Sequence, residues 1–281
     1  MMMSCCKRLL KTEHVNTLPI IQNLQKPYSL FKKVVSKAPT KTSAISDDVA
    51  DAFWQYINIL FMYDVRHYNN FMGMIVRHKE DFHEIYRIIG ELETALTVLS
   101  FRQSLPAFCL PAFNNENALK VDEIFHPLIH KPVKNSAKIV CDSLLTGSNA
   151  SGKSTFIKTL AVNGILAQTI YTCTAKHFVT QFAHVITSMA MRDNLLGGES
   201  YFIVEIKSLK RILDAVQKFP CICYIDEILR GTNTVERIAA SAAVLGWLAE
   251  RDCLCIAASH DIELRKLSFL RERNNRQSRR F

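Results

Sequence analysis

Nine consecutive residues near the middle of the chain limit most strongly what it can fold into. They read Gly-Ser-Asn-Ala-Ser-Gly-Lys-Ser-Thr, which satisfies the pattern of a glycine, four free positions and then Gly-Lys-Ser. Small residues let the backbone curl so that successive N–H groups point inward at phosphate oxygens, and a following helix adds its positive N-terminal end. The sequence therefore predicts a phosphate-binding loop made of Gly147, Ser148, Asn149, Ala150, Ser151, Gly152, Lys153, Ser154 and Thr155.

The flanks of this loop favour a strand before it and a helix after it. An apolar run at 139–145 precedes the loop, and the proline-free stretch Phe156 to Ile170 follows it. In such a loop the lysine, here Lys153, reaches the β- and γ-phosphates of a nucleotide, and the hydroxyl of Ser154 ligates Mg²⁺. We therefore expect a nucleotide and Mg²⁺ to bind here.

Composition excludes several classes of protein. With 281 residues and 48% hydrophobic content, the chain can bury a sizeable core. No run approaches the roughly 18 apolar residues of a membrane helix, and no apolar signal region follows the basic start. Nine scattered cysteines fit a reducing compartment better than a disulfide framework. These features predict a cytoplasmic protein without a membrane partner.

The formal charge of +9 is concentrated at the two ends. Residues 1–45 carry about +7 and residues 265–281 about +6, so the part between them is about −4. Basic ends can contact nucleic-acid phosphates without sequence preference, but many basic tails are simply solvated. The charge is therefore compatible with DNA binding and does not by itself establish it.

Five segments follow from the distribution of prolines and apolar residues. They are a basic, poorly ordered segment at 1–45, a helical lever or core segment at 46–105, a connector at 106–135, a nucleotide-binding domain at 136–267 and a basic tail at 268–281. In the helical segment, apolar residues recur at steps of three and four, which predicts a buried stripe at Ile85, Ile88, Ile89, Leu92, Leu96 and Leu99. Aromatic residues at helical spacing there favour a core over base stacking; they are Trp54, Tyr56, Phe61, Tyr63, Tyr68, Phe71 and Tyr86.

Two further strands end in groups that suit hydrolysis. The apolar run at 221–225 leads into Asp226 and Glu227. Asp226 would hold Mg²⁺, and Glu227 would orient and deprotonate the attacking water. A second apolar run at 254–258 leads to His260, which could contact the γ-phosphate or the water.

Together these residues resemble a known family. Residues 146–155, the run Asp-Glu-Ile-Leu-Arg-Gly-Thr-Asn-Thr at 226–234 and Ala-Ser-His at 258–260 look like the ATPase domain of the MutS DNA mismatch-repair proteins, which are ABC-type ATPases. The segment 198–205 resembles the Ser-x-Phe-x-x-Glu segment of that family, and His126-Pro127 resembles its His-Pro pair. The resemblance spans roughly 85–267. It implies an α/β fold of the ABC-type P-loop class, with a parallel-rich sheet covered by helices and preceded by an α-helical lever.

The resemblance also implies a mechanism and partners. ABC-type domains pair head to tail around two ATP molecules, so a homodimer through the ATPase face is expected. Ser200 would reach the γ-phosphate held by the partner subunit, and residues 230–234 would cross the interface. Asn149 would sense the attacking water. ATP hydrolysis would then be coupled to DNA, of duplex form and with mismatched duplexes as candidate targets.

This sequence also departs from the family pattern. Leu229 stands where the family usually has glycine, and Glu236-Arg237 stand where it usually has Asp-Gly. No Phe-x-Glu tripeptide is expected to serve as the mismatch-probing wedge of the family, and no room is expected for its amino-terminal mismatch-binding and connector domains. After His260 the chain becomes Arg-rich and stops at Phe281. A divergent or truncated MutS-like protein is therefore expected, and mismatch recognition rests on kinship alone.

Four alternatives remain open. The chain could be another ABC-type ATPase, although Leu-Ser-Gly-Gly is missing, or a non-catalytic MutS-like fragment. A small-molecule kinase fits Asp226-Glu227 less well. The pairs Cys221/Cys223 and Cys253/Cys255 raise zinc binding, but cysteine is also a common core residue.

Overall fold

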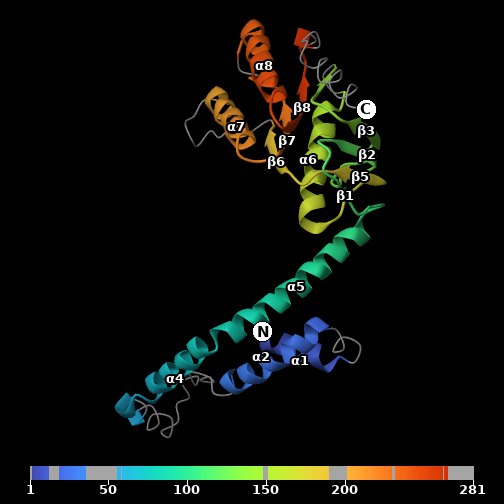
Figure 1. Ribbon diagram of the computed structural model, residues 1–281. Coiled ribbons are helices and arrows are strands. Elements are labelled where there is room, and N and C mark those ends of the chain that lie inside the picture. The colour runs from blue at the N-terminus through green and yellow to red at the C-terminus, as the bar shows by residue number, and fades with distance from the viewer. Residues whose placement is uncertain are drawn as a thin grey trace. The chain divides into compact units, whose positions relative to one another are not determined.

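The computed structural model describes residues 2–12, 19–35, 56–57, 59–147, 151–189, 201–229, 232–261 and 263–264. The chain divides into two compact units, Met1–Ser100 and Phe101–Phe281. The first unit contains helices, and the second contains two β-sheets with helices between and beside them (Figure 1).

Four helices form the described part of the first unit. They are α1 (Met2–Lys11), α2 (Pro19–Val35), α4 (Tyr63–Arg77) and α5 (Lys79–Ser104), the last of which continues four residues into the second unit. Cys6, Leu24, Ile85 and Ile88 are fully buried and form a small core. Residues 1–45, predicted to be poorly ordered, thus contain two helices, because their apolar side chains are buried against α5.

The predicted stripe on α5 is only partly buried. Ile85 and Ile88 are inaccessible to solvent, whereas Leu96 and Leu99 are 65% and 52% exposed. The prediction that the aromatic residues of this segment are core is wrong for most of them: Tyr56, Phe61, Tyr63, Tyr68 and Tyr86 are exposed. In the described part of the chain, α4 contacts α2 over only a short stretch, so helical spacing alone did not ensure a partner surface. Trp54 lies outside the described residues.

The expectation that the chain has no Phe-x-Glu tripeptide is wrong, because α5 contains one. Phe82, His83 and Glu84 lie within the helix, and the Glu84 carboxylate accepts hydrogen bonds from the Arg87 guanidinium at 2.9 and 2.6 Å. The glutamate is therefore engaged along its own helix, and nothing about this segment distinguishes it from an ordinary helical surface.

The parallel sheet of the second unit has the strand order β4-β8-β7-β6. Its strands are β4 (Ser143–Thr146), β6 (His184–Ser188), β7 (Cys221–Asp226) and β8 (Cys253–Ser259), and every neighbouring pair is parallel. Helix α6 (Lys153–Ile170) packs on one face, and α7 (Tyr201–Val216) and α8 (Thr234–Ala249) pack on the other (Figure 1). The predicted α/β fold, with a parallel-rich sheet covered by helices, is confirmed.

A second sheet, which sequence analysis did not anticipate, has the order β1-β5-β2-β3. It consists of β1 (Ala112–Phe113), β2 (Leu119–Ile124), β3 (Asn135–Ile139) and β5 (His177–Thr180). Two of these strands lie in the segment 106–135 that was predicted to be a connector. The apolar run at 139–145 is likewise shared between β3 and β4, which belong to different sheets. Between them, the buried Asp142 accepts a hydrogen bond from the Cys255 N–H at 2.7 Å.

The two C-x-C pairs are neighbours in the parallel sheet. Cys221 is in register with Cys253, and Cys223 with Cys255. All four are free thiols buried against α7 and α8, and burial raises the pKa of Cys221 to about 11. They therefore pack as small core side chains. Among the described helices, none has both the length and the apolar character needed to cross a bilayer.

Candidate functional site

The carboxyl ends of β4, β7 and β8 meet at one edge of the parallel sheet. Thr146 at the end of β4 is in register with Ser259 at the end of β8, and Asp226 at the end of β7 is in register with Ala258. Ligands of open α/β sheets bind at this edge. The strand order thus brings together three segments that are far apart in the sequence.

The glycine at the start of α6 is conformationally required. Gly152 has a φ of 85°, in the left-handed region that favours glycine, and it is the N-cap of α6. Since glycine has no side chain, it cannot cap the first-turn N–H groups of this helix, and such groups suit an anion. Lys153 follows directly, and its Nζ donates to the Gly147 carbonyl at 2.7 Å and to Ser151 Oγ at 3.3 Å.

Ser154 and Asp226 join α6 to the end of β7. The Ser154 hydroxyl donates to Asp226 Oδ1 at 2.9 Å, and Asp226 is only 4% exposed. A hydroxyl and a carboxylate are oxygen ligands of the kind that Mg²⁺ takes in proteins, together with phosphate oxygens and water. The pair therefore fits the predicted metal position.

Glu227 and His260 face each other across the edge of the sheet. Glu227 has a φ of 63° and its N–H donates to the Ala258 carbonyl at 3.0 Å, which fixes it beside β8. Its carboxylate contacts Nε2 of His260, and Nδ1 of the same ring lies 3.3 Å from the Gly147 carbonyl. The Glu227 side chain is 15% exposed and that of His260 39%. One imidazole therefore joins the candidate base to the beginning of the phosphate loop.

The residues around α8 complete the surroundings of this edge. Leu229 has a φ of 55°, which explains why glycine is favourable at this position, although the Leu229 side chain is buried in the core. The Asn233 side chain caps α8 by accepting the Glu236 N–H at 2.9 Å. Arg237, the residue after Glu236, forms an ion pair with Asp261. No local pattern in the sequence gives Arg237 or Asp261 a role, because the two partners are 24 positions apart.

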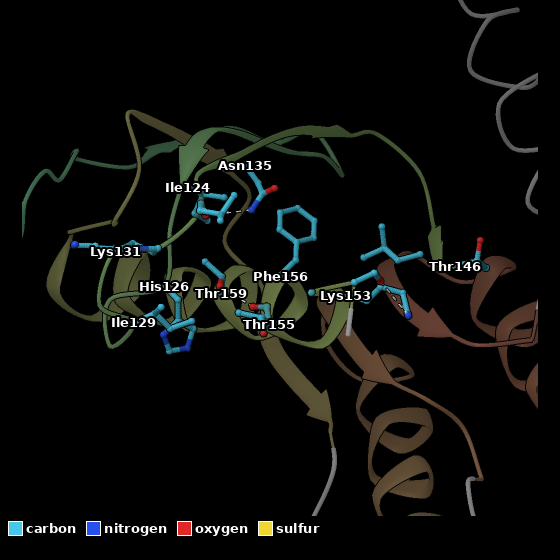
Figure 2. Close-up of a pocket in the computed structure, with 15 residues that line it drawn as sticks. Ile124, His126, Ile129, Lys131, Asn135, Thr146, Lys153, Thr155, Phe156 and Thr159 are labelled. Carbon is cyan, nitrogen blue, oxygen red and sulfur yellow. Dashed lines mark hydrogen bonds between the residues drawn. The ribbon is translucent and has the colours of Figure 1, made fainter. Parts of the chain in front are cut away.

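A cavity of about 640 Å³ opens beside the start of α6 (Figure 2). The segment after β2 forms one wall, and the first turns of α6 form the facing wall. Apolar and polar side chains both contribute to the lining, which consists of Ile124, His126, Ile129, Lys131, Pro132, Val133, Asn135, Leu145, Thr146, Ser151, Gly152, Lys153, Thr155, Phe156 and Thr159. The second sheet therefore supplies a wall of this cavity, which no single sequence motif indicated.

Most of the site residues named from the sequence lie together at this edge. Gly147, Ser151, Gly152, Lys153, Ser154, Thr155, Asp226, Glu227 and His260 are all among the described residues. Ser148, Asn149, Ala150, Ser200 and Arg230 lie outside them. The functional roles of all these residues remain predictions.

Comparison with known proteins gives a family for the chain. The model of MutS domain V matches residues 143–278. The DNA mismatch repair protein MutS of Thermotoga maritima is 30% identical over 69% of this chain, and that of Thermus thermophilus is 29% identical over 70%. The DNA mismatch repair protein msh3 of Botryotinia fuckeliana is 28% identical over 69% of this chain.

These alignments cover only part of each relative. The chain spans about a quarter of the length of the two MutS proteins and less of msh3. The match to domain V begins at β4 and includes the phosphate loop, the end of β7 and His260. By this match and these relatives, the chain belongs to the MutS family.

Proposed function

We propose that this chain is the ATP-binding and ATP-hydrolysing module of a MutS-like DNA mismatch-repair protein. The observation that carries the proposal is the meeting of Ser154 with Asp226 and of Glu227 with His260 at the edge that also holds Lys153. The groups that we propose to bind phosphate, to bind Mg²⁺ and to activate water are thus adjacent. This is the set of groups that ATP hydrolysis requires.

The cavity beside α6 suits a nucleoside. Its facing walls present Phe156 and Ile129, which offer apolar surface to a base, and polar groups of His126 and Asn135, which could orient it. The phosphates would then extend toward the N-terminus of α6. There Lys153 would exchange its present hydrogen bond to Gly147 for phosphate oxygens. This arrangement supports the proposal of an ABC-type P-loop site.

Ser154 and Asp226 would hold Mg²⁺, Ser154 directly and Asp226 through water. When bound, Mg²⁺ neutralises charge that develops on the phosphates. Asp226 is buried and already accepts the Ser154 hydroxyl, so the two oxygens need no large rearrangement to share a metal ion.

Glu227 is the proposed general base. A carboxylate must lie within hydrogen-bonding reach of the attacking water in order to deprotonate it. Glu227 directly follows Asp226, which accepts the hydroxyl of Ser154 at the start of α6. His260 contacts this carboxylate and would fix its direction. Because the imidazole also approaches Gly147, it can respond to the γ-phosphate.

The proposal includes a head-to-tail homodimer coupled to duplex DNA, with mismatched duplexes as candidate targets. The relatives are named as DNA mismatch repair proteins, and the Ser200 and 230–234 segments resemble parts that complete a partner's site. A composite site would make ATP occupancy and subunit geometry one linked equilibrium, so that each could drive the other.

One experiment tests the whole proposal. The ATPase rate is measured against protein concentration with homoduplex DNA, with mismatched DNA and without DNA, alongside binding of a fluorescent ATP analogue. We expect Mg²⁺-dependent binding, a rate that rises more than linearly with concentration, and stimulation by DNA. Failure to bind the analogue would refute the nucleotide site. Binding without turnover would favour the non-catalytic alternative, and a linear, active monomer unaffected by Ser200→Ala would refute the composite site.

A further inference from the structure

Asp261, the residue after His260, forms an ion pair with Arg237 of α8. Arg237 donates two hydrogen bonds to the Asp261 carboxylate, from Nε to Oδ2 at 2.8 Å and from Nη2 to Oδ1 at 2.7 Å. Two parallel hydrogen bonds hold a guanidinium and a carboxylate in one plane, so this contact fixes orientation as well as distance. The pair therefore ties α8 to the segment that follows β8.

This pair is shielded from solvent. The Asp261 side chain is 8% exposed and that of Arg237 is 25% exposed. The hydrogen bonds from Arg237 hold the pKa of Asp261 below its usual value. Removing a buried pair from water costs about as much as its attraction returns, so the pair is a weak source of stability and a stronger source of defined geometry.

The geometry that it defines is that of the residue before Asp261. The Asp261 N–H donates to Ser259 Oγ at 3.0 Å, and the Leu264 N–H donates to the Asp261 carbonyl at 3.3 Å. The backbone is thus held on both sides of His260. Since the His260 side chain is itself partly exposed, the direction of its backbone decides whether the ring meets Glu227.

Arg237 also interacts with Glu227 electrostatically. The pKa of Arg237 is raised mainly by its hydrogen bonds to Asp261, and the charge of Glu227 adds to the same effect. The Arg237 guanidinium therefore interacts with two carboxylates: that of Asp261, which follows His260, and that of Glu227, which His260 contacts.

The position of Arg237 near the first residue of α8 links the Arg237–Asp261 pair to the start of the helix. Asn233 caps α8, and the Glu236 carboxylate accepts the Thr232 hydroxyl, one residue before that cap. Arg237 follows immediately, so a displacement of the helix start would move its guanidinium. A glycine, the residue that the MutS resemblance leads one to expect at this position, has no side chain and could not form the pair.

We propose that Arg237 and Asp261 form a positioning pair that aims His260 at Glu227, and that the pair links the start of α8 to the hydrolytic site. The proposal rests on the proposed ATPase function. Neither residue touches the nucleotide: both act through His260. Loss of the pair should therefore slow turnover and leave ATP affinity unchanged.

The kinetic test uses a double variant, Arg237→Met with Asp261→Asn, which leaves no buried charge without a partner. We expect kcat to fall about tenfold to a hundredfold, while affinity for a fluorescent ATP analogue stays within about twofold. In a His260→Ala background the same double variant should lower kcat by less than about twofold. An undiminished fall in that background, or no fall in the parent, overturns the proposal. Arg251→Met is the matched control, because Arg251 lies over the Trp247 ring near the other end of α8.

A second measurement needs no turnover. In the nucleotide-free protein, the imidazole resonance of His260, assigned with His260→Ala, is followed by NMR. Glu227→Gln should shift this resonance in the parent. In the double variant the shift should be less than about half as large, because without the pair the His260 ring is no longer directed at Glu227. An equal shift in both overturns the proposal. If the resonances behave as expected but the parent hydrolyses no ATP, the ATPase proposal fails and the positioning role of the pair stands.

Discussion

The Ser154 hydroxyl donates a hydrogen bond to Asp226 across 72 positions of sequence, at a distance of 2.9 Å. One residue belongs to the first turn of α6 and the other to the last position of β7. This contact places a hydroxyl that is proposed to bind Mg²⁺ beside a buried carboxylate, and it joins the two halves of the candidate site.

Asp226→Asn should weaken the use of Mg²⁺. The amide keeps the size of the side chain and removes its charge, so the Mg²⁺ concentration for half-maximal ATPase activity should rise about tenfold or more. A magnesium titration of the rate measures this. Asp252→Asn is the control, since Asp252 is exposed and precedes β8, at the end of the strand opposite to His260. An unchanged magnesium requirement would place the metal elsewhere.

Lys153→Ala should abolish nucleotide binding. Its ammonium is the one positive side chain at the start of α6 in the described structure and already donates to the loop at Gly147. Equilibrium binding of a fluorescent ATP analogue measures the effect. Lys158→Ala removes an equal charge from the exposed side of the same helix and should bind normally. Full affinity in the Lys153 variant would rule out the phosphate-loop assignment.

Glu227→Gln should separate binding from hydrolysis. The amide can still contact His260 but cannot accept a proton, so turnover should fall by about 10² to 10⁴ while the ATP analogue binds as before. Single-turnover hydrolysis measures the chemical step directly. The exposed Glu250, at the end of α8, provides Glu250→Gln as a control. Turnover near the parent rate would show that the base lies elsewhere.

The stability contribution of Asp261 should depend on pH in acid. Its pKa is lower in the folded protein than the ordinary 3.8, so its contribution is present above the unfolded value and is lost as the pH falls through the folded value. The unfolding free energy of the parent, relative to that of the Arg237→Met, Asp261→Asn variant, should therefore decrease as the pH falls from about 5 to about 2. Urea titrations at several pH values test this. A difference that stays constant over this range contradicts the prediction.

Asn163→Ala should destabilise the second unit. Asn163 is fully buried, donates to the Thr159 carbonyl at 3.0 Å and accepts the Thr174 N–H at 2.6 Å. Its loss leaves the buried Thr174 N–H without its partner, at a cost of about 1–3 kcal/mol. Urea unfolding followed by circular dichroism measures the cost. The exposed Gln103 gives a control, Gln103→Ala, that should change stability by less than about 0.5 kcal/mol.

The sequence by itself determined the parts of the site that depend on neighbouring residues. The phosphate loop and the strand ending in Asp226-Glu227 are local patterns, in which a glycine, a lysine or an acidic pair has one strongly favoured structural context. The helix after the loop and the parallel-rich sheet followed from the same periodicities. Alternation of apolar strands with helices favours parallel pairing because each connection must cross a face of the sheet.

Only the tertiary structure decided which of these parts meet. His260 reaches Gly147 across 113 positions because β4 and β8 are neighbours in the strand order, and no local pattern specifies that order. The same holds for the pairing of Arg237 with Asp261 and for the second sheet that walls the cavity. Burial of the tyrosines near α4 was predicted wrongly for a related reason: a helical stripe shows which residues could be covered, whereas burial requires a second surface, and that surface is a property of the folded chain.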